Sequence, residues 1–483
     1  MRGTKGVIEK LRSVPLTVKV SVSYTICSIL QRCLSFITLP LFTRLLTKEQ
    51  YGQYTLYQSW MSILMIFTTL NLAYGSFSTA MVKFEDRRDE YISSIEGICL
   101  FLSGIFLLLY LPFRNLWNRL FELPAFLMVL MVTEILMSMA IQLWSGKKRF
   151  EFKYKSVIGV TLGMAVCAPI AAFLLVIVCE EKGYARILGY ALTNIVVGGA
   201  VFILNIRRGK SIFTKEFWKY AFQFNIPLLT YYLSQVIFNQ SDRIMISHIK
   251  GMGDAAMYGV AYSLATILIF VLNAINNSYV PWLYSKMKEG DTKENGAVSC
   301  AIAFLMSLLL LGVIWFAPEI IQIMAGDDYL QAVGVVAPVT ISLLLLCYVQ
   351  FFINVEFYYE EKKLLVISSV GAALLNIVLN VLLIPKFTFV AAGYTTLFSY
   401  IIFAVCNYFA MRATLIKHNK PNDAYNIKGL LAIFFLFVMI SYLGVVLYGN
   451  FLLRIIITIA AALIILWQRK LLLQTVLKIR ERK

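Results

Sequence analysis

The stretch Asn225–Tyr262, NIPLLTYYLSQVIFNQSDRIMISHIKGMGDAAMYGVAY, carries polar and charged residues through the middle of an otherwise apolar segment. On a helix with 3.6 residues per turn, one polar stripe is formed at i, i+4, i+8 and i+11 by Tyr231, Gln235, Asn239 and Asp242. Because a charge at the centre of a bilayer costs between about 2.5 and about 17 kcal/mol, such a stripe must face water or other protein. The stretch therefore predicts a membrane helix that lines a cavity or packs inside a bundle.

An earlier stretch, Tyr24–Leu46 (YTICSILQRCLSFITLPLFTRLL), has the same character. Its polar residues fall at i, i+3, i+4 and i+7 and are Ser28, Gln31, Arg32 and Ser35. Two striped helices half a chain apart predict a transport path between two halves of the molecule.

The composition places the whole chain in a membrane. Of its 483 residues, 60% are apolar and 14% are charged, and the mean hydropathy is +0.76. Soluble domains carry about 25% charged residues, so we predict an all-α polytopic membrane protein. The net charge of +18 lies in short segments between apolar stretches, which indicates a role in topology and gives no reason to expect nucleic-acid binding. With only two histidines, the sequence predicts no metal site built on histidine.

Since a bilayer core needs about 20 helical residues, we predict fourteen transmembrane helices. They cover residues 17–43, 54–78, 92–113, 123–144, 157–179, 185–205, 221–247, 257–284, 297–317, 331–354, 364–384, 390–412, 428–448 and 451–468. If both termini are cytoplasmic, most of the 44 lysines and arginines fall in inside segments, as the positive-inside rule requires. Gly159-x-x-x-Gly163 in the fifth span is a pattern that allows close helix packing.

A weak internal repeat suggests how the helices are organised. Arg44-Leu45-Leu46 followed by Tyr51-Gly52 has a counterpart in Arg243-Ile244-Met245 followed by Tyr258-Gly259, although the spacing differs and chance is an alternative. A six-helix repeat returns the chain to the same side, so the halves would be parallel repeats about an axis along the membrane normal. We predict an N-terminal segment (1–19), an N-lobe (20–205), a C-lobe (206–412) and a last pair of helices with a basic tail (413–483).

Three segments of the chain resemble a known family. They are Leu39–Trp60 (LPLFTRLLTKEQYGQYTLYQSW), Tyr74–Phe84 (YGSFSTAMVKF) and the stretch that begins at Asn225. They resemble the polysaccharide-biosynthesis family of lipid-linked oligosaccharide flippases, which translocate O-antigen and capsule repeat units and belong to the multidrug, oligosaccharidyl-lipid and polysaccharide exporter superfamily. The resemblance extends over nearly the whole chain.

The resemblance implies a mechanism, a location and partners. It implies two six-helix lobes that work by alternating access in the bacterial cytoplasmic membrane, among membrane lipids. It also implies a cationic cavity that accepts the pyrophosphate of an undecaprenyl-linked oligosaccharide, coupling to H⁺ or Na⁺ with no other cofactor, and a polysaccharide polymerase and a chain-length regulator as partners.

The residues themselves fit such a substrate. A guanidinium can bind two phosphate oxygens at once, so Arg32 is the candidate for the pyrophosphate, and an ion pair with Glu134 or Glu96 is an equally weighted alternative. Amides donate to and accept from sugar hydroxyls, although each is more often a contact between helices. The substrate-binding candidates are Gln31, Arg32, Ser35, Gln235, Asn239, Asp242, Asn273, Asn276 and Asn277, and the candidates for ion coupling are Glu134 and Asp242.

Two other classes of protein fit the sequence less well. A cation-coupled drug or metabolite antiporter of the same superfamily should carry acidic residues in its cavity, whereas this chain carries Arg32 there. A membrane glycosyltransferase or polymerase should present catalytic residues on a large loop, and the predicted outer loops are short. We therefore predict a transporter without catalytic residues.

Overall fold

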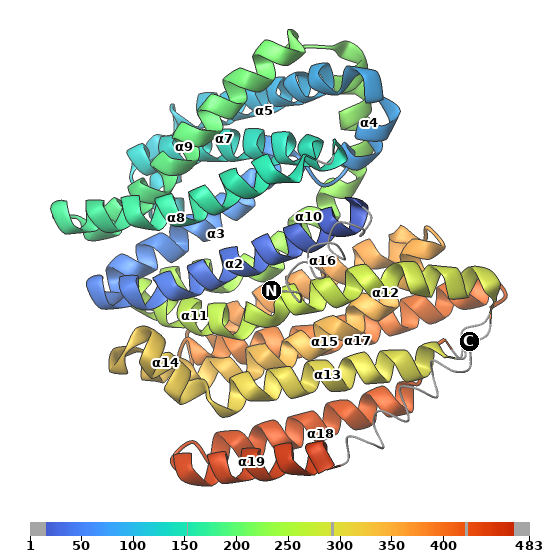
Figure 1. Ribbon diagram of the computed structural model, residues 1–483. Coiled ribbons are helices and arrows are strands. Elements are labelled where there is room, and N and C mark those ends of the chain that lie inside the picture. Colours follow the sequence, from blue (N-terminus) through green and yellow to red (C-terminus); the bar gives the residue numbers. More distant parts are fainter. Residues whose placement is uncertain (1–15, 152, 291–293, 421–423, 468–483) are drawn as a thin grey trace, which may run out of the picture. The chain divides into compact units, whose positions relative to one another are not determined.

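The computed structural model describes residues 16–151, 153–290, 294–420 and 424–467, and all its regular elements in these ranges are helices (Figure 1). In the first half they are α2 (Leu16–Leu45), α3 (Lys48–Thr69), α4 (Phe77–Lys83), η1 (Glu85–Arg87), α5 (Arg88–Tyr110), α6 (Arg114–Phe121), α7 (Ala125–Phe150), α8 (Tyr154–Val178) and α9 (Lys182–Gly209). They continue with α10 (Lys215–Lys250), α11 (Met252–Ala265), η2 (Thr266–Leu268), α12 (Ile269–Glu289), α13 (Asn295–Trp315), α14 (Ala317–Ala325), η3 (Asp327–Ala332), α15 (Val333–Tyr358), α16 (Lys362–Leu383), α17 (Val390–Lys417), α18 (Ile427–Val446) and α19 (Phe451–Trp467).

The prediction of an all-helical, multi-span membrane protein is confirmed. In the described ranges, 11 helices are long and apolar enough to cross a membrane. Three further predicted spans also correspond to helices: α3 and α10 are long but rich in polar residues, and α19 has 17 residues. The full count of fourteen spans therefore stays a prediction.

Local sequence signals account for the helix boundaries. At the start of α3, Thr47 and Gln50 form a capping box in which Thr47 Oγ1 accepts from Gln50 N and Gln50 Oε1 accepts from Thr47 N. Gly290 ends α12 in the left-handed conformation that glycine adopts without strain. The polar ends and the apolar middles of the helices both follow from the local sequence.

The described helices group into two compact units. Unit 1 contains the residues up to Val260 together with Ile323–Tyr329 and Lys363–Thr395, and unit 2 contains the remainder. Unit 1 thus includes α10 and most of α16, which the predicted boundaries of 20–205 and 206–412 assign to the C-lobe. The predicted lobes are the two halves of a repeat, whereas the units are defined by how compactly residues pack. The units therefore do not test the lobes, which stay a prediction.

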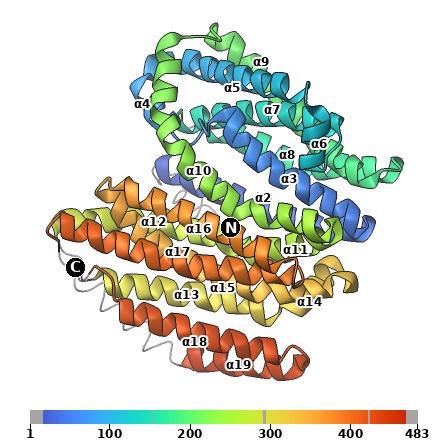
Figure 2. The ribbon, with the colours of Figure 1, turned by 180° about the vertical axis from the view of Figure 1, so that it is seen from behind.

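In unit 1, small residues bring helices close together. A Cβ atom added at Gly189 of α9 would lie 2.2 Å from Ala172 Cα of α8, and one at Gly198 would lie 2.4 Å from Met137 O of α7. Helix α10 packs along α3 and against α5 (Figure 2). Because α7 and α8 pack closely on α9, the polar side chains of α9 that face its neighbours are held in position.

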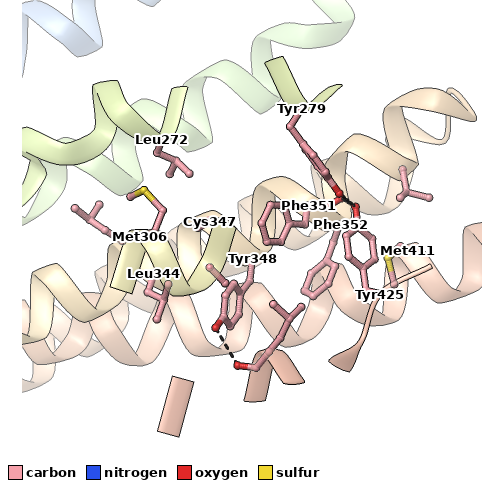
Figure 3. Packing of buried hydrophobic residues seen from close by; sticks show 14 of the residues in the cluster. Leu272, Tyr279, Met306, Leu344, Cys347, Tyr348, Phe351, Phe352, Met411 and Tyr425 are labelled. Carbon is pink, nitrogen blue, oxygen red and sulfur yellow. Dashed lines mark hydrogen bonds between the residues drawn. The ribbon is translucent and has the colours of Figure 1, made fainter. Parts of the chain in front are cut away.

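In unit 2, α13 lies between α15 and α18 (Figure 1). The core is an aromatic and aliphatic cluster around α15, in which Phe351 packs against Tyr279 and Tyr425 (Figure 3). The hydroxyl of Tyr279 donates to that of Tyr425 at 3.2 Å, and Tyr348 Oη donates to Leu430 O at 2.9 Å. These tyrosines are buried with their hydroxyls paired, as membrane packing requires.

Candidate functional site

Asp242, the last residue of the predicted stripe on α10, is 1% exposed and lies at the centre of a polar cluster in unit 1. Asn380 of α16 donates through Nδ2 to Asp242 Oδ1 at 2.6 Å, and the hydroxyl of Tyr258 on α11 donates to Asp242 Oδ2. Both carboxylate oxygens therefore accept from neutral donors on two other helices.

The cluster continues beyond the carboxylate. Asn380 Nδ2 also donates to Asn376 Oδ1 at 3.2 Å, and Ser241 Oγ donates to the same oxygen at 3.3 Å. Thr395 of α17 donates to Asn380 Oδ1. We call Ser241, Asp242, Tyr258, Asn376, Asn380 and Thr395 the Asp242 cluster; it joins four helices inside unit 1.

The Asp242 cluster is rich in oxygen atoms. A carboxylate, two amide carbonyls and hydroxyl groups are the ligand types that hard cations use, and the carboxylate can also take up a proton. Within the described ranges, no group of three or more His, Cys, Asp or Glu residues could hold a metal ion. Any cation here would therefore be held by one carboxylate with neutral oxygens.

Glu134 occupies a similar setting in another part of unit 1. It is 1% exposed on α7, and its Oε2 accepts from Tyr57 Oη at 2.8 Å. Its Oε1 accepts from Asn194 Nδ2 of α9 at 2.7 Å. The alternative ion pair with Arg32 stays a prediction, because the side chain of Arg32 lies outside the described residues.

Glu96 of α5, like Glu134, accepts a hydrogen bond from an asparagine of α9. Asn205 of α9 donates to Glu96 Oε1 at 2.7 Å, and Glu96 Oε2 is buried with no hydrogen-bond partner within the described ranges. Asn194 and Asn205 are 11 residues apart, which places them on the same face of α9. One face of α9 thus presents amides to two buried carboxylates.

The other predicted site residues have varied positions. In unit 1, Gln31 is exposed, Gln235 and Asn239 are half-buried, and Asn239 Nδ2 donates to Gln235 O at 2.7 Å within α10. In unit 2, Asn273 and Asn277 are exposed, and Asn276 Oδ1 accepts from Asn354 Nδ2 at 2.8 Å. The side chain of Ser35, like that of Arg32, lies outside the described residues. It stays a prediction that all these residues line one cavity.

The partners of the carboxylates were not among the predicted site residues. Thr395 gave no signal, since a single threonine in a membrane helix is common. Asn376 and Asn380 did give a signal, because two asparagines at i and i+4 form a polar stripe on an apolar helix. Tyr57 and Tyr258 could be matched to their carboxylates only from the packing of the helices.

The comparison with known sequences decides the family. A sequence model described as "Polysaccharide biosynthesis protein" matches residues 17–287, more than half of the chain. The chain belongs to the polysaccharide biosynthesis protein family. Among its relatives is an uncharacterized membrane protein of Haemophilus influenzae, 22% identical over 379 residues that make up 73% of this chain and 87% of the relative.

Solved structures show the fold of this family member. The structure of lipid II flippase MurJ in an inward closed conformation is similar with a TM-score of 0.70 at 16% identity, over 93% of this chain and 100% of that chain. An inward-facing multidrug resistance MATE family transporter of the MOP superfamily is similar with a TM-score of 0.57 at 12% identity, over 79% of this chain and 95% of that chain. The predicted resemblance is confirmed, and the fold is similar to those of lipid II flippase MurJ and of MATE family transporters.

Proposed function

We propose that this member of the polysaccharide biosynthesis family is a flippase for undecaprenyl-pyrophosphate-linked oligosaccharide repeat units. It moves them across the bacterial cytoplasmic membrane by alternating access for surface polysaccharide assembly. The main support is the family membership together with a fold shared with lipid II flippase MurJ over 93% of the chain. In this proposal both termini are cytoplasmic, fourteen helices cross the membrane, and a polymerase and a chain-length regulator act on the exported units.

Arg32 is the proposed partner of the pyrophosphate. A membrane-embedded guanidinium binds phosphate oxygens through two parallel N–H groups, which an ammonium cannot do. The amides of Gln31, Gln235, Asn239 and the α12 asparagines, with the hydroxyl of Ser35, supply contacts for sugar hydroxyls. The exposure of Gln31, Asn273 and Asn277 is compatible with this role.

Asp242 is the proposed coupling group. Its carboxylate accepts from donors on α11 and α16, and Asn380 of α16 accepts in turn from Thr395 of α17, so adding a proton or Na⁺ changes the charge at a point where four helices meet. Because residues from all four helices form the cluster, a change in its charge alters how these helices pack. Glu134 is a second candidate on the same reasoning.

Complementation tests the proposal. In a strain whose own gene is deleted, Arg32→Ala should abolish surface glycan at normal membrane abundance, and Arg32→Lys should restore only part of it. Asp242→Asn, which preserves size, should reduce the glycan and remove its dependence on the coupling-ion gradient. The exposed Arg119→Ala is the control and should behave as wild type.

Several outcomes would contradict the proposal. Full activity of Arg32→Ala, or its rescue by neutralising Glu134 or Glu96, would make Arg32 a structural residue. Undiminished surface glycan in the deletion strain, combined with loss of cationic dye efflux, would favour the drug-antiporter alternative.

A further inference from the structure

Arg186, in the first turns of α9, is a buried arginine whose Nε and Nη1 atoms have no acceptor among the described residues. Its side chain lies in unit 1, and the residue is 4% exposed. The guanidinium carbon lies 3.8, 4.3 and 4.5 Å from the ring centroids of Tyr54, Tyr51 and Phe42. Its Nε and Nη1 atoms are buried and have no hydrogen-bond partner, and it forms no ion pair with any described residue. The charge is thus surrounded by rings but not neutralised.

Arg454 shows how the same chain satisfies a buried arginine. It is 0% exposed in unit 2 and lies near the rings of Tyr448 and Phe451. Glu319 accepts from both terminal nitrogens, at 2.9 and 2.5 Å, and the carbonyls of Trp315, Leu447 and Tyr448 accept the remaining donors. In contrast with Arg454, Arg186 has the aromatic neighbours but neither the carboxylate nor the carbonyls.

Aromatic rings cannot substitute for those acceptors. A ring attracts the face of a guanidinium, whereas the N–H groups point outward in its plane and need an acceptor. Leaving buried donors of a charged group unpaired is costly, so a native structure either pairs them or binds a ligand. The missing component at Arg186 is therefore a hydrogen-bond acceptor that carries negative charge.

A second unpaired donor lies close to Arg186. Tyr329 is buried, its ring packs edge-on against Tyr51 at 6.3 Å, and its hydroxyl has no partner in the part of the chain that the structure describes. Tyr329 belongs to the segment Ile323–Tyr329 of unit 1, which is attached to α2 where Thr43 Oγ1 donates to Met324 O at 2.8 Å and Arg44 Nη2 donates to Ile323 O at 3.2 Å. Tyr51 therefore contacts both residues that have unpaired donors.

We propose that Phe42, Tyr51, Tyr54, Arg186 and Tyr329, the Arg186 box, bind a small inorganic anion of the halide class, with chloride as the cellular candidate. The anion accepts from Arg186 and from the Tyr329 hydroxyl. A phosphate with an organic substituent would need an opening, which the 4% exposure of Arg186 does not provide. Gln53 Oε1, near Gly183 one turn before Arg186 on α9, is a neutral acceptor that has no partner among the described residues.

Bound anion should stabilise this part of unit 1. It neutralises the buried charge and connects α9 and α3 to the segment Ile323–Tyr329, to which α2 donates two hydrogen bonds. Because the ligand binds the folded protein and not the unfolded chain, its concentration shifts the thermal midpoint.

Anion exchange on the purified full-length protein tests this. At constant ionic strength, replacing gluconate with chloride should raise the unfolding midpoint of the wild type in a saturable way. Arg186→Met should abolish the saturable rise, and Tyr329→Phe should weaken apparent chloride affinity about fivefold, as expected for one lost hydrogen bond. Arg454→Met is the matched control: it should lower the midpoint strongly and still respond to chloride as the wild type does.

Bromide diffraction gives a second measurement that does not depend on Arg186→Met folding. Crystals grown in bromide should show an anomalous peak beside Arg186 in the wild type and a weaker one in Tyr329→Phe. Identical midpoints in chloride and gluconate would overturn the proposal and leave ordered water as the partner of Arg186. A saturable response to phosphate but not to halides would overturn the assignment to the halide class.

Discussion

At the residue scale, Glu151 shows how a single carboxylate can be stabilised at the end of a membrane helix. It lies just after α7, outside the apolar spans, and it contacts Lys147 at 3.2 Å, Lys148 at 2.9 Å and Lys153 at 3.0 Å. Burial acts to raise its pKa, but hydrogen bonds from Lys148 and Lys153 and the charge of Lys147 outweigh this and lower the pKa to about 2. The ionised form is thus favoured in the folded protein.

This lowered pKa predicts a dependence of stability on pH. Since the pKa in the folded state lies below the ordinary value of 4.5, the ionised Glu151 stabilises the protein fully above pH 4.5, and the contribution is lost as pH falls toward about 2. Glu151→Gln should destabilise the purified protein by about 1 kcal/mol at neutral pH. The difference in thermal midpoint between wild type and Glu151→Gln should shrink as the pH is lowered below 4.5.

The control for this measurement is Glu85→Gln. The side chain of Glu85 is 71% exposed and pairs only with Arg88 among the described residues, so its removal should change the midpoint little at any pH. A constant difference between wild type and Glu151→Gln across the acid range would show that the three lysines do not hold the ionised form.

At the element scale, the two Tyr-Gly motifs of the internal repeat pack against each other. A Cβ atom added at Gly52 of α3 would lie 2.0 Å from Met252 O at the start of α11, and one at Gly259 of α11 would lie 2.8 Å from Thr55 Cγ2 of α3. Each glycine thus accommodates the helix that carries the other. The reciprocal contact shows that the two motifs meet in space, and the repeat itself stays a prediction.

The Gly159-x-x-x-Gly163 pattern, which permits close helix packing, is not used for it among the described residues. No described atom lies within 4 Å of a Cβ atom added at either glycine of α8, and close packing occurs instead at Gly189 and Gly198 of α9. The pattern permits a close approach, but only the arrangement of neighbouring helices decides whether one occurs.

Gly52, which packs closely against α11, and Gly159, which does not pack closely, make a matched pair for mutation. Gly52→Ala should destabilise the purified protein by about 1–3 kcal/mol, because the added methyl group collides with a backbone carbonyl that has to move. Gly159→Ala should be neutral or stabilising by up to about 1 kcal/mol, since it only improves helix propensity. Thermal midpoints in detergent give the comparison, and equal effects of the two substitutions would refute the contact between α3 and α11.

At the scale of the whole molecule, the proposed topology places Asp327 outside and Lys210 inside the cell. Both residues are exposed in the structure, so a cysteine at either position is accessible to a reagent on its own side of the membrane. In a background without the eight native cysteines, an impermeant thiol reagent added to intact cells should label Asp327→Cys and not Lys210→Cys. The reverse pattern, or labelling of both, would refute the cytoplasmic location of the termini.

The sequence by itself determined the class of the protein and the positions of its helices. The predicted span 221–247, which contains the polar stripe, corresponds to α10, which runs from Lys215 to Lys250. The three quoted segments identified the family. These features are local: apolar length, helical periodicity and short motifs depend on residues that are close in the chain.

The tertiary structure alone decided which polar groups are paired. Asp242 is bonded by Asn380, 138 residues away, and Glu134 by Asn194, 60 residues away. Arg186, at the start of the predicted span 185–205, is buried among aromatic rings from α2 and α3. Such pairings depend on which helix faces meet across the bundle, and a polar stripe shows only that a face needs partners, not which helix supplies them.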